Sequence, residues 1–90
     1  MSNLDQVIFS DVAFSNFCIW MRNNPKLFDK IESLIIDCLK HPFTGLGKPE
    51  ALRGNLIGCW SRRINDEHRL VYFITSDGVH IVECRNHYSD

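Results

Sequence analysis

The sequence has no excess of positive charge, and this limits what the protein can bind. Its 90 residues carry ten Lys and Arg against eleven Asp and Glu, which gives a formal net charge of -1. A typical nucleic-acid-binding domain is basic, so binding driven by the charge of the whole chain is excluded. Charge can still be concentrated locally, because the field at a surface depends on where the charges lie. The segment 48–69 holds five basic residues and three acidic ones.

Long hydrophobic runs and closely spaced cysteines are also missing. No apolar stretch approaches the roughly 20 residues that a membrane-spanning helix needs. The four cysteines, at positions 18, 38, 59 and 84, lie far apart, and no Cys-x-x-Cys occurs. No signal-peptide pattern is seen at the N-terminus, so reduced thiols are favoured over a disulfide framework. We therefore expect a cytoplasmic protein that is not inserted in a membrane.

The chain has the length of one small domain, which we expect to span residues 1–90. Its N-terminal half predicts a short strand and a helical hairpin. The apolar run 6–9 is the candidate strand, and Ser10 can cap the helix that follows. Apolar residues then recur at helical spacing from Phe14. Asn24 and Pro25 begin a second helix, which ends at Pro42 because a residue before proline avoids the α region.

The C-terminal half has the pattern of three strands. After a glycine- and proline-containing loop at 43–50, strands are predicted at 56–64, 68–75 and 79–85, separated by short turns. Sequential strands with short turns form an antiparallel meander. The expected fold is therefore α+β: a short N-terminal strand, a helical hairpin and an antiparallel three-stranded meander that forms a twisted sheet.

The hairpin geometry predicts which side chains share a face. A three-residue loop at 76–78 would place Thr75 opposite Val79. A loop of even length around Asp66 would turn Arg63 of the preceding strand to the other face. A loop of odd length would place Arg63 on the same face. One sheet face would then hold several cations and an imidazole: Arg63, Arg69, Arg85 and His87.

These residue types fit the cleavage of RNA without a metal. The ribose 2′-OH attacks the neighbouring phosphate, so one group must take the 2′ proton and another must protonate the departing 5′ oxygen. Glu50 is a candidate base and His87 a candidate acid. Arg63 and Arg69 can hold phosphate oxygens, and Tyr88 can stack on a base. Composition and spacing alone also fit a small α+β domain with a cationic sheet face.

A zinc site is the competing chemical interpretation. Cys84 and His87 have a Cys-x2-His spacing, but positions three apart on a strand point to opposite faces. No second pair has a comparable spacing, so we expect no metal. Gly45-x-Gly47-Lys48 lacks the full phosphate-loop pattern and follows a helix rather than a strand, so no nucleotide cofactor is expected.

Four motifs between His41 and Tyr88 occur in an order that is specific to one family. They are Gly45-x-Gly47-Lys48-Pro49-Glu50, Trp60-Ser61-Arg62-Arg63-Ile64, Glu67-His68-Arg69-Leu70-Val71-Tyr72 and Cys84-Arg85-Asn86-His87-Tyr88. Together they resemble the YoeB group of RelE-type toxins of bacterial type II toxin–antitoxin systems. The resemblance covers about half the chain by motif and the whole chain by the order of its elements.

The resemblance implies a fold, an activity and partners. The fold is the RelE-type α+β toxin fold. The activity is metal-free cleavage of messenger RNA in the ribosomal A site, which leaves a 5′-hydroxyl and a 3′-phosphate or cyclic phosphate and inhibits translation. The implied partners are a cognate antitoxin, the 70S ribosome with its mRNA, a second copy of the toxin and, only together with the antitoxin, operator DNA.

The resemblance also implies roles for individual residues. Glu50 matches the general base, His87 the general acid and Arg69 the arginine that stabilises the transition state. Tyr88 matches a terminal tyrosine that orients the mRNA. The RNA-binding residues implied by the match, through phosphate or ribosomal RNA, are Lys48, Arg53, Arg62 and Arg63. Trp60 matches a position of ribosomal RNA contact or sheet packing, with packing favoured.

Two other functions stay open at this point. ParE-type toxins share the fold but bind gyrase and lack the catalytic set, and the joint presence of Glu50, Arg69, His87 and Tyr88 argues against them. An inactive toxin that serves only as a corepressor with its antitoxin is the second alternative. The chain also departs from the family pattern, because Ser89 and Asp90 follow the tyrosine and bring negative charge near the site.

Overall fold

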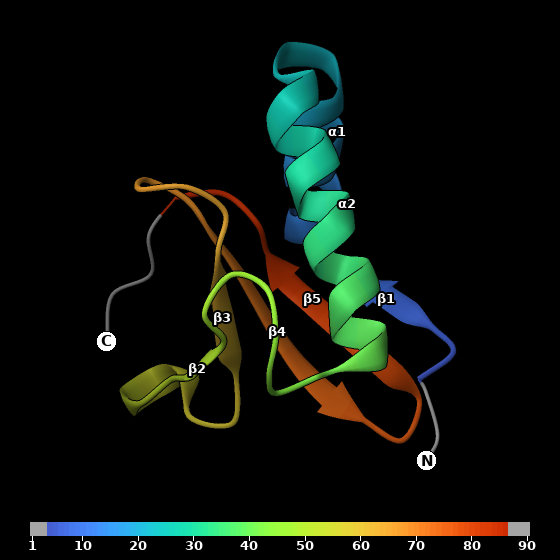
Figure 1. Ribbon diagram of the computed structural model, residues 1–90, viewed down its shortest axis with the longest axis vertical. Helices are drawn as coiled ribbons and strands as arrows, with labels where there is room; N and C mark the ends of the chain where they lie inside the picture. Colours follow the sequence, from blue (N-terminus) through green and yellow to red (C-terminus); the bar gives the residue numbers. More distant parts are fainter. Residues whose placement is uncertain (1–3, 87–90) are drawn as a thin grey trace.

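The computed structural model describes residues 4–86, and Figure 1 shows its arrangement. The helices and strands, in chain order, are β1 (Val7–Phe9), α1 (Asp11–Asn23), α2 (Pro25–Lys40), β2 (Glu50–Ala51), β3 (Trp60–Arg63), β4 (Arg69–Thr75) and β5 (Gly78–Glu83), with a 3-10 turn at Gly54–Leu56 between β2 and β3. The predicted α+β class, with its short N-terminal strand, helical hairpin and meander, is confirmed.

The helix boundaries follow from local capping chemistry. The Ser10 side chain accepts a hydrogen bond from the Ala13 N–H at 3.0 Å, and the Asn24 side chain caps α2 with Pro25 in its first turn. These caps satisfy amide groups that have no partner within the helix. α2 ends at Lys40, and the following residue, His41, has a φ of -138°, which is not helical. The predicted effect of Pro42 on the residue before it is therefore confirmed.

The sheet has five strands in the order β1-β5-β4-β3-β2. The meander β3-β4-β5 is antiparallel, as predicted, while β1 adds to β5 in parallel. The sequence did not predict β2, a two-residue strand that pairs with β3 at the end of the loop. The strand predicted over 56–64 begins only at Trp60, because Gly54 and Gly58, both with positive φ, form a 3-10 turn and a bend before it.

The core lies between the sheet and the helical hairpin. Both helices pack on the same face of the sheet (Figure 1). The apolar side of α2 supplies Ile31, Leu34 and Cys38, none of which has exposed surface. It meets every second residue of the strands, including Leu70 and Tyr72. We call this side the helix face and the other side the opposite face.

The predicted β4–β5 register was wrong at the turn. Thr75 pairs with Gly78, so the loop has two residues instead of three, and a β-bulge between Val71 and Tyr72 then shifts the ladder. The bulge inserts an extra residue into β5 and bends it. Beyond it the Arg69 N–H donates to the Asn86 carbonyl at 3.2 Å.

Arg85 was predicted to share one cationic face with Arg69, and this was also wrong. The Arg85 guanidinium carbon lies 6.0 Å from the centre of the Trp20 ring, which belongs to α1. The cation therefore packs on a helix residue. The cause is that β5 ends at Glu83 and the chain then leaves the strand direction, since Asn86 has a φ of 70°.

The described residues contain no helix that is long and apolar enough to cross a membrane. All four cysteines are free thiols, with Cys38 and Cys84 buried. Across residues 4–86 no three His, Cys, Asp or Glu side chains gather as a potential metal site.

Candidate active site

Three of the predicted site residues share the opposite face of the sheet. Glu50 of β2 pairs with Ser61 of β3, and Arg63 pairs with Arg69 of β4. Paired residues point to the same side of a sheet, and so do residues two apart on one strand. Since Arg62 lies on the helix face, Ser61 and Arg63 lie on the opposite one. The register therefore brings Glu50, Arg63 and Arg69 together on that face.

The two arginines are held differently. Arg69 is half-buried, and its Nη1 donates to the carbonyls of Asn65, at 2.9 Å, and His68, at 3.3 Å. Both acceptors lie in the connection between β3 and β4, so this connection orients the guanidinium. Arg63 is exposed. Of the two loop lengths left open by the sequence, the structure has the odd one, because Asn65, Asp66 and Glu67 separate the paired Ile64 and His68 backbones.

Glu50 is exposed and follows a loop that is attached to β3. The Arg63 N–H donates to the Gly47 carbonyl at 2.6 Å. Gly47 has a φ of 80°, and a Cβ there would lie 2.8 Å from the Leu34 side chain, so this close approach requires glycine. Lys48, with a φ of 53°, also lies in the left-handed region. The backbone thus turns sharply just before Glu50.

Arg62 corrects a prediction, because it is not available to bind RNA. It has no exposed surface and lies on the helix face. Its Nε donates to the Tyr72 hydroxyl at 3.1 Å, and its Nη1 donates to Asp37, at 2.6 Å, and to the Leu46 carbonyl, at 3.0 Å. Its Nη2 donates to the carbonyls of His41 and Thr44. Every N–H of the guanidinium is therefore satisfied inside the protein.

The Arg62 network fastens the loop that leads to Glu50. In Figure 1 this loop runs from the end of α2 across β4 towards β2. Burial by itself would raise the pKa of Asp37, but the Leu46 N–H and the Arg62 guanidinium outweigh burial and lower it. Burial raises the pKa of Tyr72 to about 12, so its hydroxyl stays protonated and donates to the Pro42 carbonyl at 2.8 Å. The loop position thus depends on an ion pair between α2 and β3.

Glu83 is a titratable group on the same face that sequence reasoning missed. It pairs with Val71, which lies two residues from Arg69 on β4 and points the same way. Burial raises the pKa of its carboxyl group. The available signal was an acidic residue at the end of a mostly apolar strand, but the face to which Glu83 points depends on the bulge. The opposite face therefore carries two carboxylates, Glu50 and Glu83, on either side of the arginines.

The remaining predicted residues lie around this centre or outside the described chain. Lys48 and Arg53 are exposed, on either side of β2. Trp60 lies with its ring centre 4.8 Å from that of Phe43, which agrees with a packing role. His87 and Tyr88 lie outside the described residues.

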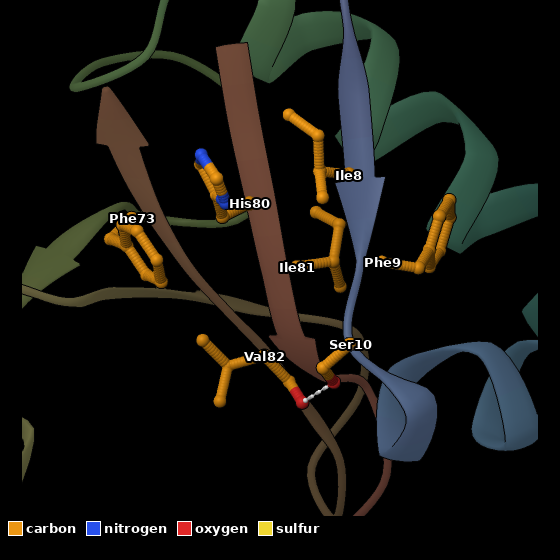
Figure 2. A pocket seen from close by; sticks show the side chains of 7 residues that line it. All are labelled: Ile8, Phe9, Ser10, Phe73, His80, Ile81 and Val82. Carbon is orange, nitrogen blue, oxygen red and sulfur yellow. Dashed lines mark hydrogen bonds between the residues drawn. The ribbon is translucent and has the colours of Figure 1, made fainter. Parts of the chain in front are cut away.

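A shallow pocket of about 270 Å³ lies elsewhere on the sheet, over β1, β5 and β4. Figure 2 shows its lining, in which the Phe73 and His80 rings stack at 4.5 Å. The His80 Nε2 is 2.8 Å from the Thr75 hydroxyl, and Ser10 donates to the Val82 carbonyl at 2.8 Å. The pocket is largely apolar and includes neither Glu50 nor the two arginines. We therefore place the candidate chemistry at the opposite face near β2 and β3.

Comparison with known proteins agrees with this fold. A toxin chain from the YoeB–YefM complex of Staphylococcus aureus superimposes with a TM-score of 0.86 and 40% identity, and covers 97% of this chain and 100% of that chain. A chain of the YoeB dimer from Staphylococcus aureus gives a TM-score of 0.87 and 39% identity, with the same coverage. The fold is that of a RelE-type toxin of a bacterial toxin–antitoxin system.

Sequence comparison narrows this class to a family. Residues 9–88 match the family described as "YoeB-like toxin of bacterial type II toxin-antitoxin system". The toxin YoeB of Escherichia coli (strain K12) is 45% identical over 83 residues, which cover 92% of this chain and 99% of that protein. The chain belongs to the YoeB family of bacterial type II toxins.

Proposed function

We propose that this toxin is a ribosome-dependent endoribonuclease that cleaves mRNA in the A site without a metal cofactor. The observation that carries the proposal is the shared face of Glu50, Arg63 and Arg69. These three come from different strands, and their chemistry matches a base and a phosphate-binding pair. Membership of the YoeB family supports the same activity.

The proposed reaction is an attack of the ribose 2′-OH on its own phosphate. Glu50 takes the 2′ proton as the new O–P bond forms. Arg69 and Arg63 stabilise the additional negative charge on the phosphate oxygens. His87 gives a proton to the 5′ oxygen as its bond to phosphorus breaks. The products are a cyclic phosphate, which can open to a 3′-phosphate, and a 5′-hydroxyl. Tyr88 orients the mRNA.

The surrounding positive groups are proposed to hold the RNA. Lys48 and Arg53 are exposed next to β2 and can reach phosphates of mRNA or ribosomal RNA. Arg62 takes no part in this binding, because it is buried. The concentration of these cations near β2 and β3 is how a chain of net charge -1 can present a cationic surface.

We also propose that a cognate antitoxin covers this face and that the toxin forms a homodimer. The support comes from the relatives solved as a YoeB–YefM complex and as a YoeB dimer. An antitoxin that carries acidic groups would complement the arginines of the opposite face. Binding of operator DNA is proposed only for the complex with the antitoxin.

The deciding experiment is primer extension on an mRNA paused in a translating ribosome. Wild-type protein is expected to create a new 5′ end in the A-site codon, and none without ribosomes. Glu50→Gln and His87→Gln should each lower cleavage by roughly 10²–10⁴-fold. Glu32→Gln, which neutralises an exposed carboxylate on α2, is the matched control and should cleave like wild type.

Two results would contradict the proposal. Wild-type rates in both Glu50→Gln and His87→Gln would remove the acid–base assignment. No cleavage by a correctly folded wild-type protein would favour the gyrase-binding or corepressor functions, and inhibition of gyrase supercoiling would then separate these two.

A further inference from the structure

The chain that follows β5 is held by a buried histidine just before β4. His68 is only 7% exposed and directly precedes Arg69, the first residue of that strand. Its Nδ1 accepts a hydrogen bond from the backbone N–H of Asn86 at 2.7 Å. The neighbouring Arg69 N–H donates to the carbonyl of the same Asn86 at 3.2 Å. Both polar backbone groups of Asn86 are thus bound to residues 68–69.

The His68 imidazole accepts the hydrogen bond that a carbonyl of a neighbouring strand would accept in a regular sheet. The paired residues of β4 and β5 end at Val71 and Glu83, beyond the bulge. Asn86 has a φ of 70°, a left-handed conformation that asparagine adopts more readily than most residues and that no regular strand contains. The acceptor of its N–H is a side chain instead of a carbonyl of the neighbouring strand. His68 supplies that acceptor.

α1 holds the histidine and the chain it binds. The Trp20 and His68 rings lie edge to face, with their centres 4.7 Å apart. The Trp20 Nε1–H donates to the Cys84 carbonyl at 2.8 Å, and the Cys84 N–H donates to the Asn16 side chain at 3.1 Å. The segment 84–86 is therefore fastened at both ends, to α1 at Cys84 and to β4 at Asn86.

The hydrogen bond defines the protonation state of the ring. A neutral imidazole accepts at one nitrogen and carries its proton on the other, so acceptance at Nδ1 requires the proton on Nε2. The Nε2 atom lies 3.7 Å from a Glu67 carboxylate oxygen, which suits a protonated nitrogen. Replacing the acceptor would remove the hydrogen bond that ties the Asn86 backbone to a buried side chain.

We propose that His68 is a positioning residue, whose Nδ1 holds the backbone of Asn86 and so places the segment that continues into His87. This inference rests on the proposed function, in which His87 is the general acid. Asn86 directly precedes His87 in the sequence, so a displaced Asn86 backbone moves the acid relative to the leaving oxygen. Small misplacements of a catalytic group cost rate rather than binding.

A matched pair of substitutions isolates the acceptor. His68→Asn keeps an acceptor oxygen at the same number of bonds from Cα as Nδ1, whereas His68→Gln places its oxygen one bond further out, as Nε2 is. Both variants lose the ring that packs against Trp20. We expect His68→Gln to lower kcat for cleavage of ribosome-bound mRNA by about 10²-fold with KM for the ribosome unchanged. His68→Asn should keep most of the wild-type kcat.

Amide exchange and imidazole spectra provide readouts that do not depend on cleavage. The Asn86 amide should be protected from hydrogen exchange in wild type and His68→Asn, and should exchange faster in His68→Gln. In the wild-type protein, proton–nitrogen correlation spectra should show His68 Nδ1 unprotonated and Nε2 protonated. A wild-type ring with the proton on Nδ1 would overturn the proposal, even if neither variant folds.

Equal losses of kcat in the two variants, with folding verified by circular dichroism, would also overturn it, because the ring and not the acceptor would then matter. Failure of the proposed function has a different signature, since wild type and His87→Gln would then show equal cleavage or none. That result would rule out a role of His68 in the reaction. The exchange data would still show whether His68 holds the Asn86 backbone.

Discussion

Arg63 and Arg69 are direct cross-strand partners on β3 and β4, and both side chains point to the face opposite the helices. Like charges directly opposite each other destabilise a sheet. Repulsion between the two guanidinium groups therefore lowers the stability of the folded state. A bound phosphate would neutralise this repulsion. Such an arrangement is typical of an anion-binding site built at the expense of stability.

Arg63→Gln tests this relationship. Removing one of the facing charges should raise the free energy of unfolding by about 0.2–1 kcal/mol at low salt, and the gain should shrink as salt screens the wild-type repulsion. Cleavage of ribosome-bound mRNA should fall by about 10- to 100-fold, because one charged hydrogen bond to phosphate is lost. Urea unfolding and primer extension measure the two effects. Lys30→Gln, on the exposed side of α2, is the control and should change neither. A clear loss of stability in Arg63→Gln would contradict the repulsion argument.

Asp37→Asn tests the ion pair that holds the loop. It leaves the buried Arg62 without its counter-charge and should lower the free energy of unfolding by about 3 kcal/mol at pH 7. The pKa of Asp37 is lower in the folded protein than its ordinary value of 3.8. Its stabilisation is therefore fully present above that value and lost as the pH falls through the lowered pKa. The gap between wild type and Asp37→Asn in urea unfolding should narrow below about pH 4. A gap that is constant from pH 7 to pH 3 would mean that the charge of Asp37 is not what stabilises the loop.

Gly47→Ala tests the close contact between the loop and β3, with Gly58→Ala as its matched control. Both glycines have positive φ, 80° and 95°, so both variants carry a similar conformational cost of roughly 1–2 kcal/mol. Only Gly47 has neighbours near the added Cβ, at 2.8 Å from Leu34 and 3.1 Å from the Arg63 carbonyl, whereas none lies within 4 Å at Gly58. We expect Gly47→Ala to lose clearly more unfolding free energy and to lower cleavage as well, since Glu50 follows three residues later. Equal thermal unfolding of the two variants would show that the contact adds nothing.

Thiol labelling tests the burial of two cysteines. Burial raises the pKa of Cys38 to about 11 and that of Cys84 to about 12. At pH 8 on the order of one thiol in a thousand or fewer is then ionised, and the thiolate is the reactive form. Iodoacetamide should therefore modify Cys18 before Cys38 and Cys84 in the native protein, and all four in urea, as followed by mass spectrometry. Rapid native labelling of Cys84 would argue against the packing of the segment after β5.

The helices and the meander could be predicted because their signals are local. Ser10, Asn24 and Pro42 act on the backbone within a turn of their own position, and alternation along β4 is visible within the strand. β2 could not be predicted, since two residues carry no periodicity and Glu50–Ala51 is a strand only through its pairing with β3. The two-residue turn at Ser76–Asp77 and the bulge beyond it likewise depend on contacts between strands.

The candidate site was predictable in its residue types but not in its arrangement. Arg62 and Arg63 are chemically identical neighbours, and both were predicted to bind RNA. A shift of one residue in register would exchange their faces, because side chains alternate along a strand. In the structure Arg62 meets Asp37 beneath the loop, while Arg63 meets Arg69 on the opposite face.

The sequence by itself determined the helix ends, the meander, the family and the chemical groups at hand, Glu50 and the arginines among them. These depend on residue type and on spacing over a few positions. Only the tertiary structure decided that Arg62 is a structural cation, that Glu83 joins the face with Glu50, and that His68 holds Asn86. Each of these depends on strand pairing and packing between residues far apart in the chain, where one bulge or one residue of turn length reverses the side to which a group points.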